Sequence, residues 1–244
     1  NLGSMVTPIG NPQNLYLYGQ SGMSLGSFIM LMLPYAAIAA VIFALMIMRM
    51  KNQNVDTTAL QTMDAPKINV DRDLIIYMAL FLGCVLAVAK ILPWQAMLIV
   101  VGAVTVKSDA SILKNVDYSL LLTFVAFFVF IGNLGRSPFF SEMIMEMMQG
   151  NEVLASVAAS QVISNVPAAL LLSGFTDRSR ELLLGVNIGG AGTIIASLAS
   201  LITFREYMSH NPGKAGHYMA RFSAVNFSFL GILLGFCMLL VKLW

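Results

Sequence analysis

Amide and hydroxyl side chains interrupt one of the apolar runs near its centre. The run Val153–Phe175 is long enough to cross a membrane, yet its middle reads Ser-Asn-Val-Pro from Ser164 to Pro167. Proline removes a backbone donor and clashes with the preceding turn, so we expect the helix to break there. Broken backbone within lipid is tolerated only where it is buried in protein or lines a watery cavity. The run is therefore either a re-entrant hairpin with a polar tip or a discontinuous span, with a kinked helix as the alternative that needs no site.

A second polar stretch, Asn187–Leu201, interrupts the apolar run Leu182–Phe204. It aligns without gaps on the first residues of the chain, Asn1–Leu15, at an offset of 186. The identical pairs are Asn1 and Asn187, Gly3 and Gly189, Thr7 and Thr193, Ile9 and Ile195, and Leu15 and Leu201. This pattern predicts an internal repeat. We therefore expect Asn1 to lie in an unwound helix segment, and the chain to be the C-terminal part of a longer protein with about one structural repeat upstream.

Helix breaks that recur near the bilayer midplane are the means by which secondary transporters build a solute site. Half-helix N-termini offer free N–H groups and a positive dipole end to anions. Unwound carbonyl groups and side-chain oxygens can coordinate a desolvated sodium ion, and glycines allow the backbone to approach a ligand closely. The predicted substrate-binding residues are Ser164, Asn165, Gly192, Thr193, Thr7 and Asn11, and the predicted ion-binding residues are Ser164, Asn165, Gly189, Asn187, Gly3 and Gly10.

The composition places these residues in an integral membrane protein. Hydrophobic residues make up 58% of the chain and charged residues 11%, against about 45–50% and about 25% in soluble domains. The net charge of +2 is small and the basic residues are scattered between apolar runs, which excludes a nucleic-acid partner. The sequence contains no evident set of nucleophile, base and orienting residue, and no metal triad. It therefore favours a protein that is not an enzyme and has no cofactor beyond a sodium ion.

The apolar runs predict an all-α polytopic fold. At about 1.5 Å per residue, a run of some twenty residues covers the ~30 Å of a hydrocarbon core. The expected elements are a crossing at Phe28–Met48, two short crossings within Leu74–Val106 that meet at Lys90–Trp94, a crossing at Tyr118–Leu134, an amphipathic surface helix at Phe139–Met148, the hairpin at about 153–175, the broken helix at about 182–204 and a final helix at 222–243. The expected divisions are the end of a first repeat (1–50), a linker (51–73) and a second repeat (74–244).

Two topologies remain open on the charges alone. Nine Lys and Arg residues fall on one side and five on the other, whether the run Val153–Phe175 re-enters or crosses. The positive-inside rule therefore does not separate the two arrangements. The repeated loops are inverted if this run re-enters and parallel if it crosses. With re-entry, the linker 51–73 and the loop 205–221 are expected on the cytoplasmic side of the cell membrane.

Together these motifs resemble the ion-transporter superfamily of citrate and dicarboxylate symporters, arsenite permeases and sodium/proton antiporters. The resemblance covers essentially the whole chain and is greatest to bacterial anion permeases with a citrate-transporter-like domain. It implies two inverted repeats, each with a re-entrant hairpin and a broken helix, in a homodimer that moves by an elevator-like shift. In the dicarboxylate symporters the hairpin tips carry Ser-Asn-Thr and bind a carboxylate beside sodium. Ser164 and Asn165 match this motif, whereas Val166 stands in place of the threonine.

The positions of the acids favour an anion carrier. All twelve Asp and Glu residues lie in loops or near the ends of apolar runs, whereas proton-driven antiporters usually need an ionisable group within the membrane. We therefore expect a secondary active transporter of small anions, either citrate-like carboxylates or arsenite-like oxyanions, with sodium as the candidate coupling ion. The alternatives are a sodium/proton antiporter of the same superfamily and an anion channel.

Overall fold

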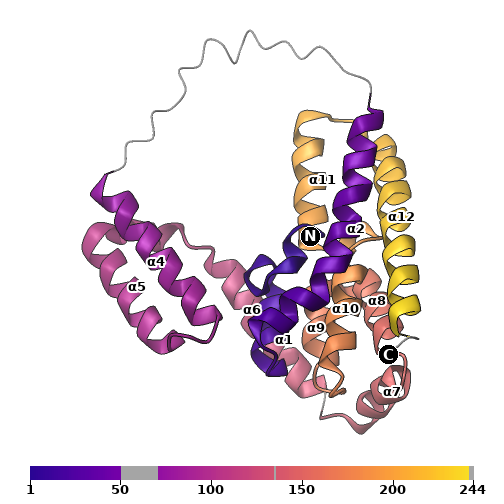
Figure 1. Ribbon diagram of the computed structural model, residues 1–244, viewed down its shortest axis with the longest axis horizontal. Helices are drawn as coiled ribbons and strands as arrows, with labels where there is room; N and C mark the ends of the chain where they lie inside the picture. The colour runs from indigo at the N-terminus through magenta and orange to yellow at the C-terminus, as the bar shows by residue number, and fades with distance from the viewer. Residues whose placement is uncertain (51–70, 135, 242–244) are drawn as a thin grey trace. The chain divides into compact units, whose positions relative to one another are not determined.

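The computed structural model describes residues 1–50, 71–134 and 136–241, which form helices and connecting turns without a strand (Figure 1). The α-helices are α1 (Pro12–Ser21), α2 (Leu25–Arg49), α4 (Arg72–Val88), α5 (Trp94–Asp109), α6 (Tyr118–Leu134), α7 (Pro138–Met148), α8 (Glu152–Ile163), α9 (Asn165–Leu172), α10 (Ser179–Gly189), α11 (Leu198–His210) and α12 (Ala215–Val241). The short 3-10 helices are η1 (Ser4–Val6), η2 (Pro8–Gly10), η3 (Ala110–Asn115) and η4 (Ile194–Ala196). The predicted all-α polytopic fold is confirmed.

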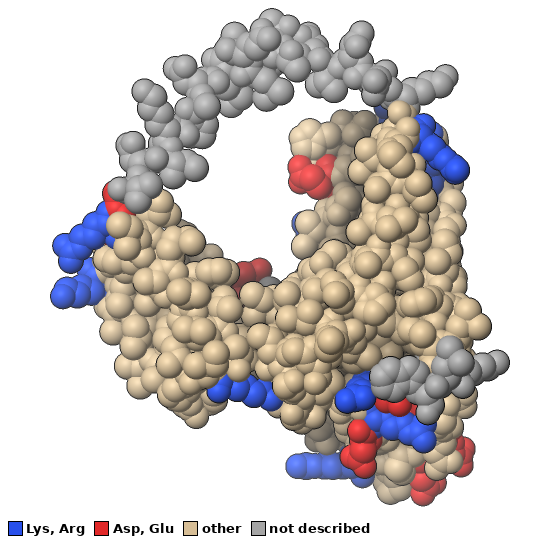
Figure 2. All heavy atoms as spheres, in the orientation of Figure 1, with Lys and Arg blue, Asp and Glu red and all other residues tan. Residues whose placement is uncertain are grey.

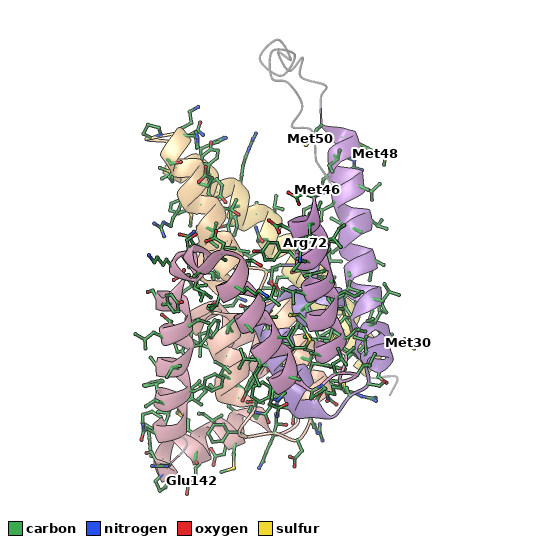
Figure 3. All side chains as sticks on the ribbon, turned by 90° about the vertical axis from the view of Figure 1, so that its left-hand side faces the viewer. Met30, Met46, Met48, Met50, Arg72 and Glu142 are labelled. Atoms are coloured by element: carbon green, nitrogen blue, oxygen red, sulfur yellow. The ribbon has the colours of Figure 1, made fainter. Side chains whose placement is uncertain are left out.

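Within the described residues, three helical segments are long and apolar enough to cross a membrane, namely Leu25–Arg49, Trp94–Asn115 and Ala215–Leu240. Their outer surfaces are apolar: Met30 is 78% exposed and Met48 is 73% exposed, and both project outward from α2 (Figure 3). On the visible face of each part of the chain, the charged side chains gather near helix ends (Figure 2). Large exposed apolar surfaces flanked by charge are typical of helices that contact lipid.

The predicted surface helix directly follows the apolar helix α6. The helical segment Leu121–Leu134 and α7 meet at an angle of 96°, so α7 leaves the direction of α6 almost at a right angle. On α7, Phe139 is 70% exposed, and Glu142, near the middle of the helix, is exposed at the lower edge of the view (Figure 3). A perpendicular amphipathic helix after an apolar one is the geometry that an interfacial segment requires.

The contacts divide the chain into two units, Asn1–Ala40 with Asp117–Trp244, and Val41–Val116. In the second unit α4 and α5 pack against each other. Their approach is close at Gly83, where a Cβ would lie 2.6 Å from the methyl carbon of Met97. The chain reverses at Lys90, whose φ is 62°, so the two predicted short helices are present and meet where expected. The division into repeats at 50 and 73 stays a prediction, and residues 51–70 of its linker lie outside the described residues.

The predicted loop 205–221 is mostly helical. Helix α11 continues to His210 and α12 begins at Ala215, so only residues 211–214 connect them. The loop prediction was wrong in its extent because hydropathy marks the apolar part of a helix, and these two helices continue into polar sequence at their adjoining ends. Backbone hydrogen bonds do not require apolar side chains.

Helices α8 and α10 run parallel, and this fixes the path of the chain between them. A Cβ on Gly185 would lie 2.6 Å from the Cβ of Ser156, and one on Gly189 would lie 2.8 Å from the Cβ of Ser160. Both contacts advance along both helices in the same direction. After α8 the chain must therefore run back to the level at which α8 began before α10 can start. Helix α9 makes this return and packs beside both helices (Figure 1). The run Val153–Phe175 folds back at Ser164, as the hairpin interpretation expected.

An ion pair closes the base of the hairpin. Nη1 of Arg178, just before α10, lies 3.5 Å from Oε2 of Glu152, at the start of α8. A single straight helix of twenty residues would separate its two ends by roughly 30 Å. The contact between residues at the two ends of the run therefore excludes a continuous crossing.

Replacing Arg178 with alanine is expected to lower stability by about 1 kcal/mol. The Arg178 side chain is 59% exposed, which weakens the pair by solvent screening, but the Glu152 side chain is 7% exposed and would lose its counter-charge. The temperature of half-unfolding in detergent, followed by fluorescence-detected size exclusion, measures this effect. The matched control is Arg180→Ala, two residues later in the first turn of α10 and also exposed; equal effects of the two variants would contradict a role for the pair.

Candidate functional site

The two repeated motifs adopt the same backbone path at the same offset. The helices η2 and η4 are 186 residues apart, and so are the first residues of α1 and α11, Pro12 and Leu198. The residues before these helices match as well, with φ -143° and ψ 147° at Asn11 and φ -146° and ψ 137° at Ser197. The internal repeat predicted from five identities is therefore present in the conformation of the chain, in both copies of the motif, Asn1–Leu15 and Asn187–Leu201.

The hairpin tip lies against the second unwound segment. Ser164 has φ 74° and ψ 153°, a strained conformation for a residue other than glycine, of the kind found at ligand clamps. Its Oγ donates to the carbonyl of Ala196 at 3.4 Å. Asn165 follows as the first residue of α9 and is 2% exposed. A Cβ on Gly190 would lie 2.9 Å from the Nδ2 of Asn165, so the tip amide and the unwound backbone are neighbours.

Gln161, one turn before the tip, holds the second unwound segment in place. Its Nε2 donates to the carbonyls of Gly189 at 2.7 Å and Ala191 at 3.0 Å. Its Oε1 accepts from the backbone N–H of Thr193 at 2.8 Å, and its own carbonyl accepts from Thr193 Oγ1 at 3.0 Å. Gly192 has φ 115°, and any Cβ there would collide with the Gln161 carboxamide, so only glycine fits. The predicted residues Gly189, Gly192 and Thr193 thus meet at one side chain.

The first unwound segment is held by its own polar side chains. Ser4 Oγ hydrogen-bonds the carbonyl of Asn1 at 2.9 Å and Asn11 Oδ1 at 2.8 Å, and Asn11 Nδ2 donates to the carbonyl of Asn1 at 3.3 Å. A Cβ on Gly10 would collide with the Ser4 carbonyl, whereas one on Gly3 would meet nothing within 4 Å. Gly10 is therefore required by the fold of the segment, while the structure shows no close approach that explains Gly3.

A buried pair of asparagines joins the two repeats. Asn187 Nδ2 donates to Asn14 Oδ1 at 2.6 Å and to the carbonyl of Leu183 at 2.9 Å. Asn14 Nδ2 in turn donates to the carbonyls of Met5 at 3.2 Å and Thr7 at 3.3 Å. Asn14 is 0% exposed and Asn187 is 1% exposed. The predicted residues Asn187 and Thr7, from different repeats, are thus connected through Asn14.

Several buried amide atoms around this junction have no protein partner. They are Asn1 Nδ2, Gln13 Nε2 and Asn187 Oδ1. Asn1 Nδ2 lies against Gly190, the residue that also contacts Asn165. A buried polar group without a hydrogen bond costs free energy unless a ligand or water satisfies it. A concentration of such groups where three polar segments meet is therefore suited to binding a polar solute.

Three helices begin at this junction without a side-chain cap. The residues preceding α1, α9 and α11 are Asn11, Ser164 and Ser197, and none of these side chains makes a capping hydrogen bond. The first N–H groups of a helix have no partner within it and form the positive end of its dipole. Thr7, Asn11, Ser164 and Thr193 are each half-buried. The site thus combines neutral oxygens and amides with positive helix ends, some within reach of solvent.

A depression of about 540 Å³ lies elsewhere in the same unit. It is lined by residues of the α1–α2 connection and of the start of α10, among them Ser24, Arg178 and Arg180. None of the predicted site residues lines it. Because it opens at the base of the hairpin and not at its tip, it is separate from the candidate site.

Sequence reasoning left Gln161 and Asn14 out of the site. Gln161 carried a signal, because it is a large amide within an apolar run, one turn before Ser164. Asn14 carried a weaker signal as the last polar residue of the repeated motif, since its counterpart at the offset of 186 is Ser200. Both contact carbonyls of unwound backbone, and such contacts depend on tertiary packing that spacing along the chain does not reveal.

Comparisons with known proteins indicate a membrane transporter. A family described as "Citrate transporter" matches residues 1–179. The "Uncharacterized transporter MJ0456" of Methanocaldococcus jannaschii is 36% identical over 225 residues, which cover 90% of this chain and 58% of that protein. The "Inner membrane protein YbiR" of Escherichia coli strain K12 is 32% identical over 209 residues, which cover 84% and 55%. The chain thus spans a little over half the length of these relatives. No solved structure matches the chain.

Proposed function

The chain belongs to the citrate transporter family, and from this membership and the site we propose that it forms part of a secondary active transporter for small anions. Membership in this family indicates a membrane transporter. The substrate class is our inference from the chemistry of the site. We place citrate-like carboxylates first and arsenite-like oxyanions second, bound between the hairpin tip and the two unwound segments.

The observation that carries this proposal is the meeting of three uncapped helix N-termini with an unpaired buried amide. The side chain of Asn165, 2% exposed, makes no hydrogen bond to another residue that the structure describes. A negative charge near a helix N-terminus is stabilised by about 0.3–1 kcal/mol, and by more when the site is partly buried. An anion can therefore be held here without a basic side chain. A bare cation would face the positive ends of the same helices.

The described acids support an anion carrier over a sodium/proton antiporter. Among the residues that the structure describes, Glu152 is the one buried acid, and it pairs with Arg178 at the base of the hairpin. A carboxylate that carries protons in an antiporter lies within the membrane and within reach of the transported ion. Glu152 lies at the opposite end of α8 from the polar tip, which is not where such a group is needed.

We propose the remaining features of the transporter by resemblance and by charge. Sodium is the candidate coupling ion, and a homodimer in the cell membrane is the proposed assembly. The linker 51–73 and the residues 205–221 are proposed to face the cytoplasm. The printed name of the Escherichia coli relative, an inner membrane protein, supports this location.

Uptake into proteoliposomes made with the full-length protein tests the proposal. Labelled citrate, succinate and arsenite are compared with and without a sodium gradient, and each is tested for counterflow from preloaded vesicles. We expect uptake and counterflow of at least one of these anions. Uptake without counterflow indicates a channel. Sodium/proton exchange with no anion movement would refute the anion assignment.

A further inference from the structure

The carboxamide of Gln161 lies where two backbone carbonyls of the unwound segment converge. The Gly189 and Ala191 oxygens are 2.7 and 3.0 Å from one atom, Gln161 Nε2. Two carbonyl oxygens directed at one point repel each other unless a positive group lies between them, which is why such oxygens so often bind metal cations. Here the partial positive charge of an N–H₂ group fills that place.

The first repeat contains the same arrangement with a different amide. Asn14 Nδ2 lies 3.2 Å from the carbonyl oxygen of Met5 and 3.3 Å from that of Thr7. Met5 is the counterpart of Ala191 at the offset of 186 residues. Equivalent carbonyls in the two repeats are thus each bridged to a second carbonyl by a side-chain amide. The amide comes from the hairpin in one repeat and from the following helix in the other.

We propose that Gln161 is a positioning residue that substitutes for a coordinating cation in the second unwound segment. This inference rests on the proposed function. Gln161 holds the carbonyls of Gly189 and Ala191 together and keeps the N–H of Thr193 engaged through Oε1. The shape of the segment, and with it the alignment of the α11 N-terminus toward the anion, then does not require a sodium ion at these two oxygens.

Gln161→Met keeps the length of the side chain but removes the donor and the acceptor. We expect hydrogen–deuterium exchange of peptides covering residues 189–193 to become at least tenfold faster. We also expect the KM for the transported anion to rise at least tenfold, with the maximal rate within threefold of wild type. Gln161→Glu is nearly isosteric but places an acceptor against two carbonyl oxygens, so its KM is expected to rise further than that of Gln161→Met.

The control is Gln20→Met, an exposed glutamine on α1 that donates to Tyr16 Oη, and it should behave as wild type. Gln161→Asn, which is too short to bridge the same carbonyls, serves if the other variants do not fold. Wild-type exchange and wild-type KM in a folded Gln161 variant would overturn the inference. A lower melting temperature with an unchanged KM would also overturn it, because it would show a merely structural role.

The two proposals can fail separately. Hydrogen exchange of residues 189–193 is measured without any solute, so it tests the positioning by Gln161 even if no anion is transported. The response of the melting temperature to sodium is a second measurement that separates the Gln161 inference from the anion-transport proposal. The sodium-induced rise in melting temperature should be no smaller in Gln161→Met than in wild type, since the amide, and not sodium, lies between the Gly189 and Ala191 oxygens of the wild type. A rise that appears in wild type and is absent in the variant would contradict the inference while leaving anion transport intact.

Discussion

Asn165→Ala is expected to abolish measurable anion uptake while the protein remains folded and in the membrane. The Asn165 amide is 2% exposed and makes no hydrogen bond to the rest of the described chain, so its removal breaks no internal hydrogen bond. A hydrogen bond to a charged ligand contributes about 1.5–3 kcal/mol, which corresponds to a loss of roughly 10- to 100-fold in binding. Uptake by purified, reconstituted protein at low substrate concentration measures the effect.

The matched control for this variant is Asn226→Ala on α12. The Asn226 amide is part-buried and donates to the carbonyl of Phe222 at 3.0 Å, one turn earlier. This variant removes an amide of the same size from a helix outside the site, and uptake should stay near the wild-type rate. Normal transport by Asn165→Ala would show instead that the hairpin tip has a structural role only.

Gly185→Val is expected to destabilise the hairpin more than any surface substitution would. A Cβ on Gly185 would lie 2.6 Å from the Cβ of Ser156 and 2.7 Å from the carbonyl oxygen of Val153. Both neighbours are on α8, and a backbone oxygen cannot rotate away as the end of a flexible side chain can. Overpacking of this kind costs about 1–3 kcal/mol and occasionally more. We expect a clear fall in the melting temperature and in the amount of monodisperse protein.

The control is Gly231→Val on α12, where a Cβ would meet nothing within 4 Å. This glycine lies in an apolar helix as Gly185 does, so the two variants differ mainly in packing and not in helix propensity. Melting temperatures measured side by side in the same detergent separate the two effects. Equal melting temperatures would contradict the parallel packing of α8 on α10, and with it the hairpin.

The sequence predicted the helix breaks because their causes are local. Pro167 after two polar residues, and the repeated Gly and Thr at an offset of 186, act through backbone sterics within a few residues. The direction of the chain after the first break was not predictable. Lysine and arginine counts were equal for both paths, and the contact that decides between them joins Glu152 to Arg178 across the folded hairpin.

The composition of the site was predicted in part. The predicted Ser164, Asn165, Gly192 and Thr193 are neighbours in the fold, but the side chain that joins the last two is Gln161. Whether a polar residue contacts unwound backbone depends on how helices pack, and packing sets contacts between residues that are distant in sequence. Spacing shows which backbone groups will lack partners, whereas only the fold shows which side chains supply them.

Protection of engineered cysteines by the transported anion tests most directly whether the two repeats share one solute site. In full-length protein with all native cysteines, Cys84 and Cys237 among them, replaced by serine, maleimide labelling is timed at Ser164→Cys, at Asn11→Cys and at the exposed control Ser209→Cys in the last turn of α11. A saturating transported anion should slow labelling at the first two positions with the same concentration dependence, and leave the control unchanged. Unchanged labelling at both Ser164→Cys and Asn11→Cys, in protein that still transports, would contradict a shared site.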